Sequence, residues 1–97
     1  MKVAIITGAT SGIGYEAAIQ IDRRFVSLDE IWIIGRREEK LLELQKKLQH
    51  SVRTFAMDVT DDGDMTEFEN VLYKLNPNIR MLFQSAGMGE QLNEFIS

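Results

Sequence analysis

Several residue types that carry function elsewhere are absent or rare in this 97-residue chain. It has no cysteine, which excludes disulfides and thiolate metal sites and favours a cytoplasmic location. No apolar run approaches the roughly 20 residues that span a bilayer, and the N-terminus has no signal-peptide pattern, so we expect no membrane partner. The only histidine, His50, has no nucleophile or carboxylate pair beside it. A structural role at the carbonyls that end the preceding helix, or plain exposure, is therefore favoured over catalysis.

Basic residues are too few and too scattered for a nucleic-acid surface. The chain has 11 lysines and arginines against 15 acidic residues, which gives a formal net charge of −4. A nucleic-acid-binding domain would carry a basic stripe, so no nucleic-acid partner is expected. The exception to the scatter is the pair Arg36-Arg37. The length allows one domain, residues 1–97, and a hydrophobic fraction of 44% is ordinary for a globular protein.

A glycine-rich loop follows the first apolar run. Three glycines, Gly8, Gly12 and Gly14, fall within seven positions and lead into a segment with helical spacing. Glycine permits positive φ and leaves no Cβ in the way of a ligand. A loop that enters a helix N-terminus aims free N–H groups and the helix dipole at one point, which attracts phosphate. The glycines alone are equally consistent with a tight turn that binds nothing.

Strand-like and helix-like segments alternate along the chain. Apolar runs predict strands over residues 3–6, 31–34, 52–57 and 79–83. Helical spacing predicts helices over residues 12–25, 38–49 and from the acidic cluster at 61–64 to just before Pro77, with a helix or loop over 88–97. Such alternation implies parallel strands with right-handed helical crossovers. We therefore predict an α/β fold: a three-layer, Rossmann-type parallel sheet with strand order 3-2-1-4, one half of a doubly wound fold. The glycine loop would lie at its switch point, where ligands bind.

The helices carry further expectations. In the first, Ile13, Ala17, Ile21 and Phe25 recur at fourfold spacing, with Ala18 beside them, and predict the buried stripe. The small residues Ala17 and Ala18 would let that helix lie close to the sheet. In the second, the stripe is Leu41, Leu44 and Leu48, and in the third it is Met65, Phe68, Leu72 and Leu75. The acidic cluster before the third helix lacks the spacing and closing glutamate of a calcium loop. It is interpreted as a helix start with several possible N-caps, and no metal site is expected.

Three motifs resemble those of the short-chain dehydrogenases/reductases. The loop Thr7-Gly8-Ala9-Thr10-Ser11-Gly12-Ile13-Gly14 resembles the family's Thr-Gly-x-x-x-Gly-x-Gly. Asp58-Val59 resembles its adenine-contacting Asp-Val, and Ser85-Ala86-Gly87 its Asn-Ala-Gly. The motifs occur in the family's order and cover the chain almost end to end. The resemblance implies that a dinucleotide cofactor is bound by Gly8, Thr10, Ser11, Gly12, Ile13, Gly14, Arg36, Arg37, Asp58, Val59, Ser85, Ala86 and Gly87.

Physical roles can be assigned within that loop. Gly8 would permit the turn, Gly12 would admit the pyrophosphate against bare backbone, and Gly14 would allow close packing of helix on strand. The amides of Ser11 through Gly14 would donate to phosphate. Asp58 would accept from the adenine amino group, or would serve only as a carboxylate at a helix entry.

Arg36 and Arg37 bear on the choice of cofactor. An acid about 20 residues beyond the glycine loop would hold the ribose 2′-hydroxyl of NAD. This chain has two arginines there and no carboxylate before Glu38. A guanidinium favours a 2′-phosphate through charge and bidentate geometry, so NADP is predicted and NAD is less favoured. The alternative is a solvated pair that opens a helix.

Two departures from the family pattern limit what the chain can do alone. Ser85 stands where the family has asparagine, which puts the fit of the nicotinamide half in doubt. The family's catalytic residues, a serine, a Tyr-x-x-x-Lys pair and a helix asparagine, lie downstream of its Asn-Ala-Gly, and this chain has only ten residues after Gly87. Its two tyrosines do not substitute, since the fourth residue after Tyr15 is Ile19 and the fourth after Tyr73 is Pro77.

We therefore expect the cofactor-binding portion of an NADP-dependent oxidoreductase, inactive by itself. The alternatives are a non-catalytic nucleotide-sensing or interaction module and an inactive remnant. Association into a homo-oligomer, through the apolar fourth strand at the sheet edge or through residues 88–97, is also expected.

Overall fold

A computed structural model describes residues 1–85 of the chain. In this part, strands and helices alternate as predicted, each within two residues of its expected ends. The elements are β1 (Lys2–Thr7), α1 (Gly12–Arg24), β2 (Glu30–Gly35), α2 (Glu38–Lys47), β3 (Ser51–Ala56), α3 (Asp62–Leu75) and β4 (Asn78–Gln84). None of the helices in residues 1–85 is long and apolar enough to cross a membrane.

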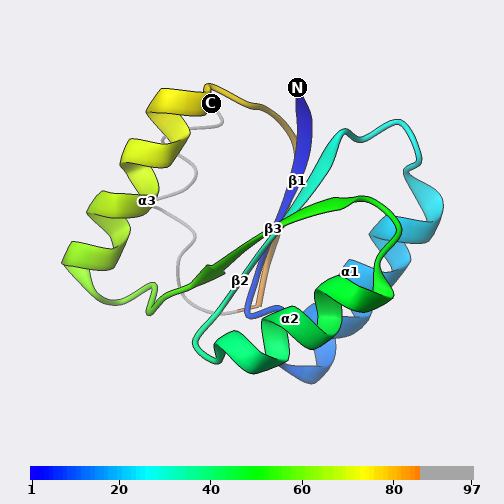
Figure 1. The fold of residues 1–97 in the computed structure, drawn as a ribbon, viewed down its shortest axis with the longest axis horizontal. Coiled ribbons are helices and arrows are strands. Elements are labelled where there is room, and N and C mark those ends of the chain that lie inside the picture. The colour runs from blue at the N-terminus through cyan, green and yellow to red at the C-terminus, as the bar shows by residue number, and fades with distance from the viewer. Residues whose placement is uncertain (86–97) are drawn as a thin grey trace.

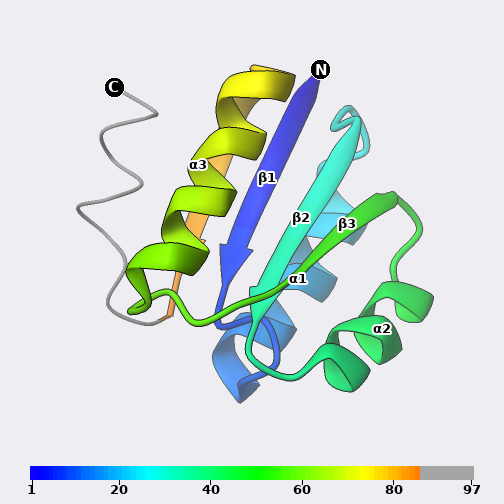
Figure 2. The same ribbon diagram turned by 60° about the vertical axis from the view of Figure 1, so that its left-hand side comes forward.

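The four strands form one parallel sheet in the order β3-β2-β1-β4, which confirms the predicted strand order. Helices α1 and α2 cover one face of the sheet and α3 covers the other (Figures 1 and 2). The three-layer Rossmann-type architecture is therefore confirmed. Because all strands run the same way, the loops that follow β1, β2 and β3 meet at one end of the sheet.

The two central strands are buried on both faces. Side chains of alternating residues in β1 and β2 point to opposite layers, where they join two separate apolar clusters. One cluster, on the side of α1 and α2, includes Ala4, Ile6, Ile31, Ile33, Leu41 and Leu44. The other, on the side of α3, includes Val3, Ile5, Trp32, Ile34, Phe68 and Leu72. Burial on both faces explains why these strands are continuous apolar runs, and each buried side chain contributes roughly 1.5–3 kcal/mol.

The predicted buried stripe of α1 is correct at Ile21 and at the neighbouring Ala18, but it is wrong at its two ends. Ile13 and Phe25, placed in that stripe, are 72% and 43% exposed. The residues that α1 buries are Gly14, Ala18, Ile21 and Asp22. The buried side of this helix is poor in large apolar residues, and its small residues Gly14 and Ala18 let it lie close to the sheet. The apolar stripes of α2 and α3 are confirmed, with Leu75 only half-buried.

The acidic cluster begins α3, as predicted. Asp61 is the N-cap, and its side chain accepts a hydrogen bond of 2.8 Å from the Asp64 amide. Asp64 in turn accepts one of 2.9 Å from the Asp58 amide. These bonds tie the end of β3 to the start of α3. On the far side of the sheet, β4 pairs with β1, and the expected association through β4 stays a prediction.

Candidate cofactor site

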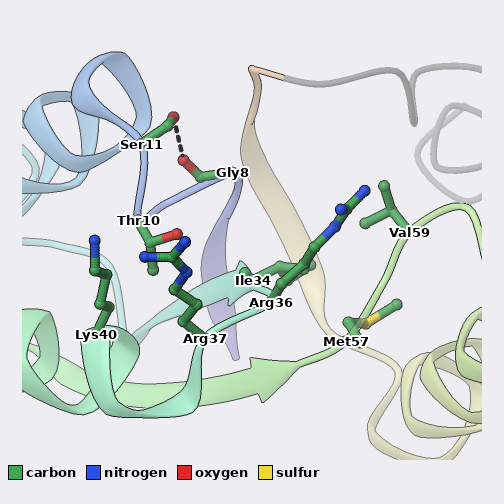
Figure 3. A pocket seen from close by; sticks show the side chains of 10 residues that line it. Gly8, Thr10, Ser11, Ile34, Arg36, Arg37, Lys40, Met57 and Val59 are labelled. Atoms are coloured by element: carbon green, nitrogen blue, oxygen red, sulfur yellow. Dashed lines mark hydrogen bonds between the residues drawn. The ribbon is translucent and has the colours of Figure 1, made fainter.

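The glycine loop is held tightly at the carboxyl end of the sheet. Gly8 follows β1 with φ of +63°, in the left-handed region that favours glycine. The Ala9 amide donates to the Ile34 carbonyl at 3.0 Å, which fastens the loop to β2. The Ser11 amide and hydroxyl both donate to the Gly8 carbonyl, at 3.0 and 2.7 Å (Figure 3). The chain therefore turns sharply from β1 into α1 at Gly8, and the two Ser11 bonds hold that turn.

The three glycines of the loop stand in different surroundings. A Cβ at Gly8 would collide with the Ser85 hydroxyl, and one at Gly14 would collide with the Gly8 carbonyl. A Cβ at Gly12 would meet no atom of residues 1–85 within 4 Å. The first two glycines are therefore needed by the fold. Gly12 is not, because the described residues leave the space on its Cβ side open.

The Ser11 amide does not fit the predicted set of phosphate donors, because it already donates to Gly8. The first helical hydrogen bond of α1 runs from the Tyr15 amide to the Ser11 carbonyl at 2.8 Å. The amides of Gly12, Ile13 and Gly14 precede it and have no intrahelical acceptor. These three N–H groups remain as the candidate phosphate donors.

A cavity of about 440 Å³ lies on the β2 side of the loop. It is lined by Gly8, Thr10, Ser11, Ile34, Gly35, Arg36, Arg37, Lys40, Met57 and Val59. The structure thus brings together the glycine loop, the arginine pair and Val59, which lie far apart in the sequence. Among residues 1–85, no acidic side chain lines this cavity. Lys40 was missed in the sequence, although its place one turn after Arg37 puts both residues on one side of α2.

Asp58 lies beside the cavity and holds Arg36. One Asp58 oxygen, Oδ1, is 3.6 Å from a terminal nitrogen of Arg36. The same oxygen accepts hydrogen bonds from the Thr60 hydroxyl at 2.6 Å and the Thr60 amide at 2.9 Å. These bonds lower the pKa of Asp58 below its ordinary value, and the Arg36 guanidinium adds to the effect. Asp58 is therefore an ionised acceptor at neutral pH.

A second hollow lies on the opposite side of the loop. This groove of about 480 Å³ is lined by Gly12, Ile13, Glu16, Ala17, Gln20 and Phe83. Ile13, a candidate cofactor residue, is thus placed at the surface between α1 and β4. The loop around Gly12 therefore separates a cationic cavity on one side from a largely apolar groove on the other.

Ser85 ties the ends of two strands together. Its hydroxyl donates to the Thr7 carbonyl at 2.8 Å, which joins the end of β4 to the end of β1. Ser85 therefore supplies a bond between two strands, and its one hydroxyl proton is used there. The last two candidate residues, Ala86 and Gly87, lie outside the described residues.

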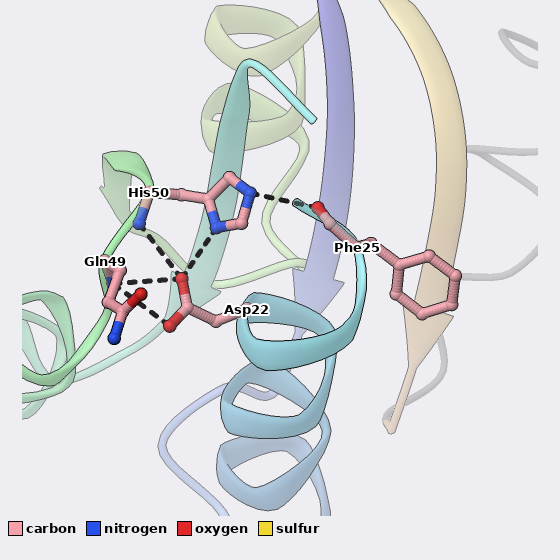
Figure 4. A network of polar contacts seen from close by, with 4 residues as sticks. All are labelled: Asp22, Phe25, Gln49 and His50. Atoms are coloured by element: carbon pink, nitrogen blue, oxygen red, sulfur yellow. Dashed lines mark hydrogen bonds and ion pairs between the residues drawn. The ribbon is translucent and has the colours of Figure 1, made fainter. Parts of the chain in front are cut away.

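His50 joins a buried polar network with Asp22 (Figure 4). Its Nδ1 is 2.7 Å from Asp22 Oδ1, and its Nε2 is 3.0 Å from the Phe25 carbonyl. The Asp22 carboxylate also accepts the Gln49 and His50 amides at 3.0 Å. The favoured structural role is thus confirmed, but the ring serves the carbonyl at the end of α1 rather than those of the preceding helix α2. The network fastens the end of α1 to the connection between α2 and β3.

We expect Asp22→Asn to lower the free energy of unfolding at pH 7 by about 2 kcal/mol, since hydrogen bonds to a charged group contribute roughly 1.5–3 kcal/mol. Burial alone would raise the pKa of Asp22, but the bonds from His50 and Gln49 outweigh burial and lower it below 3.8. The stabilisation is therefore full above the unfolded pKa and is lost as pH falls through the folded one. Urea unfolding at pH 7 and pH 3 measures both effects, with Glu67→Gln as control. An unchanged midpoint for Asp22→Asn at pH 7 would contradict this account.

Comparison with known proteins identifies the family. The family model described as short chain dehydrogenase matches residues 2–97. Sulfoacetaldehyde reductase 2 of Chromohalobacter salexigens is 37% identical over an alignment of 91 residues, and the match covers 89% of this chain and 34% of that protein. The structure of a short chain dehydrogenase from Bacillus anthracis matches with a TM-score of 0.71 and 28% identity, over 89% of this chain and 34% of that one. L-Sorbose reductase from Gluconobacter frateurii, complexed with NADPH and L-sorbose, matches with a TM-score of 0.70 and 27% identity, over 92% of this chain and 34% of that one.

The matches cover almost all of this chain but only a part of its relatives. The chain spans 38% and 34% of the length of two curated relatives that it matches. Its sheet order, the position of its glycine loop and the match to the family model all agree. The chain belongs to the short-chain dehydrogenase family.

Proposed function

We propose that this chain is the NADP-binding portion of an oxidoreductase. The observation that carries the proposal is the cavity in which three cations, Arg36, Arg37 and Lys40, lie beside the glycine loop. With no acid lining it in residues 1–85, the cavity lacks the carboxylate that would hold the ribose of NAD. An anionic group on the ribose suits these cations better than a hydroxyl does.

The two hollows beside the loop match the two ends of a dinucleotide. In the proposal, the adenosine end occupies the cationic cavity and the pyrophosphate lies over Gly12, where residues 1–85 leave the Cβ side open. The nicotinamide end occupies the groove that Ile13 and Phe83 line. The amides of Gly12, Ile13 and Gly14 then donate to the pyrophosphate, with the positive end of the α1 dipole behind them.

Asp58 and Val59 complete the adenosine end. The ionised carboxylate of Asp58 can accept an N–H from the adenine amino group while it keeps its bonds from Thr60. Val59 and Met57 offer apolar surface to the ring within the same cavity. Arg36 lies near this wall, with a terminal nitrogen 3.6 Å from the Asp58 carboxylate.

The bound cofactor supplies the hydride chemistry, and the protein supplies binding and orientation. This chain would therefore present the nicotinamide for reaction with a carbonyl or alcohol. That proposal draws support from the related L-sorbose reductase, whose structure is complexed with NADPH. We further propose that this chain alone turns over no substrate, because its two tyrosines lack a lysine four positions later.

The proposal predicts that NADPH binds at least tenfold more tightly than NADH, and that the double variant Arg36→Ala/Arg37→Ala loses most of this preference. A charge-assisted contact contributes roughly 1.5–3 kcal/mol, and each 1.4 kcal/mol is tenfold in affinity. Calorimetric titration of both cofactors measures the preference. Arg23→Ala/Arg24→Ala is the matched control. It also removes two positive charges, but from the last turn of α1, where neither arginine lines the cavity. Equal or tighter binding of NADH by the unmodified chain would refute the NADP assignment.

A further inference from the structure

We propose that Lys40 determines cofactor specificity, forming with Arg37 and Thr10 the subsite that takes the 2′-phosphate. The inference rests on the proposed function, since it concerns the same cavity. It adds a residue that none of the sequence motifs contains. It also divides the three cations of the cavity into two groups with different surroundings.

The cations point to different sides of the cavity (Figure 3). Arg36 extends toward Val59 and the end of β3. Arg37 and Lys40 lie on the other side, where Thr10 of the glycine loop faces them. The second group is therefore the one beside the phosphate-binding loop.

The two groups also differ in how far their charge is balanced. Arg36 has Asp58 within 3.6 Å. Neither Arg37 nor Lys40 forms an ion pair within residues 1–85, although α2 carries Glu38, Glu39 and Glu43. None of these three glutamates lines the cavity. The unbalanced positive charge of the cavity is therefore concentrated at Arg37 and Lys40.

Thr10 supplies a hydroxyl at the same place. Its side chain packs over Gly35, where a Cβ would lie only 3.1 Å from the Thr10 methyl and 3.3 Å from its hydroxyl oxygen. Within the described part of the chain this hydroxyl has no hydrogen-bond partner. The hydroxyl therefore lies against Gly35 at the start of the cavity wall, and its proton remains available to a ligand.

A phosphate monoester fits this combination. It carries a charge of about −1.5 to −2 at neutral pH and three acceptor oxygens. A guanidinium fork, an ammonium and a hydroxyl can donate to these oxygens at once. The N-cap of α2, Arg37, makes no side-chain capping bond, so its guanidinium is not engaged by the helix start. A ribose 2′-hydroxyl would use few of these donors and would leave the two charges unbalanced.

The test compares two nucleotides that differ only in the 2′-phosphate, adenosine 2′,5′-bisphosphate and AMP. We expect Lys40→Met to weaken binding of the bisphosphate about tenfold and to leave AMP within twofold. Methionine keeps the unbranched stem and the helix propensity of lysine. Lys46→Met, in the last turn of the same helix, removes the same net charge and should change neither affinity. Lys40→Arg should restore most of the lost affinity, and Thr10→Val should lower the affinity for the bisphosphate alone, by a smaller factor.

The outcomes separate this inference from the proposed function. If the unmodified chain binds both nucleotides equally, the NADP assignment itself fails. If it prefers the bisphosphate and Lys40→Met keeps the full preference, the proposed function stands and the role of Lys40 is refuted. Equal weakening of both nucleotides by Lys40→Met would also refute it, because Lys40 would then act on a group that both ligands share.

Discussion

Valine at position 12 should abolish dinucleotide binding while the chain stays folded. In the proposed complex the pyrophosphate lies directly over the Gly12 backbone, so the branched side chain of Gly12→Val would occupy its place. The amides of the first turn would then lose their charge-assisted bonds to phosphate, each worth roughly 1.5–3 kcal/mol, and the affinity should fall at least a hundredfold.

The fold should tolerate the change, because within the described part of the chain a Cβ at Gly12 meets no atom within 4 Å. Far-UV circular dichroism and the urea midpoint should therefore match those of the unmodified chain. Calorimetric titration with NADPH measures the binding. Normal affinity in a folded Gly12→Val variant would place the phosphate site elsewhere.

The opposite result is expected two residues later, where Gly14→Ala should damage the fold. Its methyl group would collide with the carbonyl of Gly8 and lie 3.1 Å from the Ala9 Cα. These are backbone atoms, so no rotamer change relieves the clash. Alanine gains about 1 kcal/mol over glycine in helix propensity, but overpacking costs typically 1–3 kcal/mol and occasionally more. We expect a net loss of about 2 kcal/mol in the free energy of unfolding.

Gly12→Ala is the matched control for that experiment. It makes the same substitution in the same turn of α1, with open space around the new methyl group. Urea unfolding should therefore show a lower midpoint for Gly14→Ala and an equal or higher one for Gly12→Ala. Equal midpoints for the two variants would mean that α1 does not need its close approach to the loop.

The fold was largely predictable because β1 and β2 are buried on both faces. Their continuous apolar runs, separated by amphipathic helices, leave few alternatives to a parallel sheet with crossovers. Helix α1 was harder to interpret. Apolar residues at fourfold spacing correctly indicated Ile21, with Ala18 beside it, but they also selected Ile13 and Phe25, which are exposed. The buried carboxylate of Asp22 could not be found from an apolar pattern.

Interactions between segments that are far apart in the chain could not be predicted from the sequence. The charged side chain of Asp22 is buried only because Gln49 and His50 bring donors to it from 27 and 28 positions away. Similarly, the bond between Ser85 and Thr7 appears only once β4 lies beside β1. The arginine pair and the glycine loop could be predicted as parts of one site, since parallel strands end at the same edge. The position of Lys40 required the orientation of α2 on the sheet.

The most direct test of the cofactor site is a titration of the ¹⁵N-labelled chain with NADP⁺, followed by amide chemical shifts in NMR spectra. The account predicts saturable shifts at Gly12, Ile13 and Gly14 and at Arg36 and Arg37, with little change at Gly63 in the first turn of α3. The absence of saturable shifts, or shifts confined to residues away from the glycine loop and the start of α2, would contradict it.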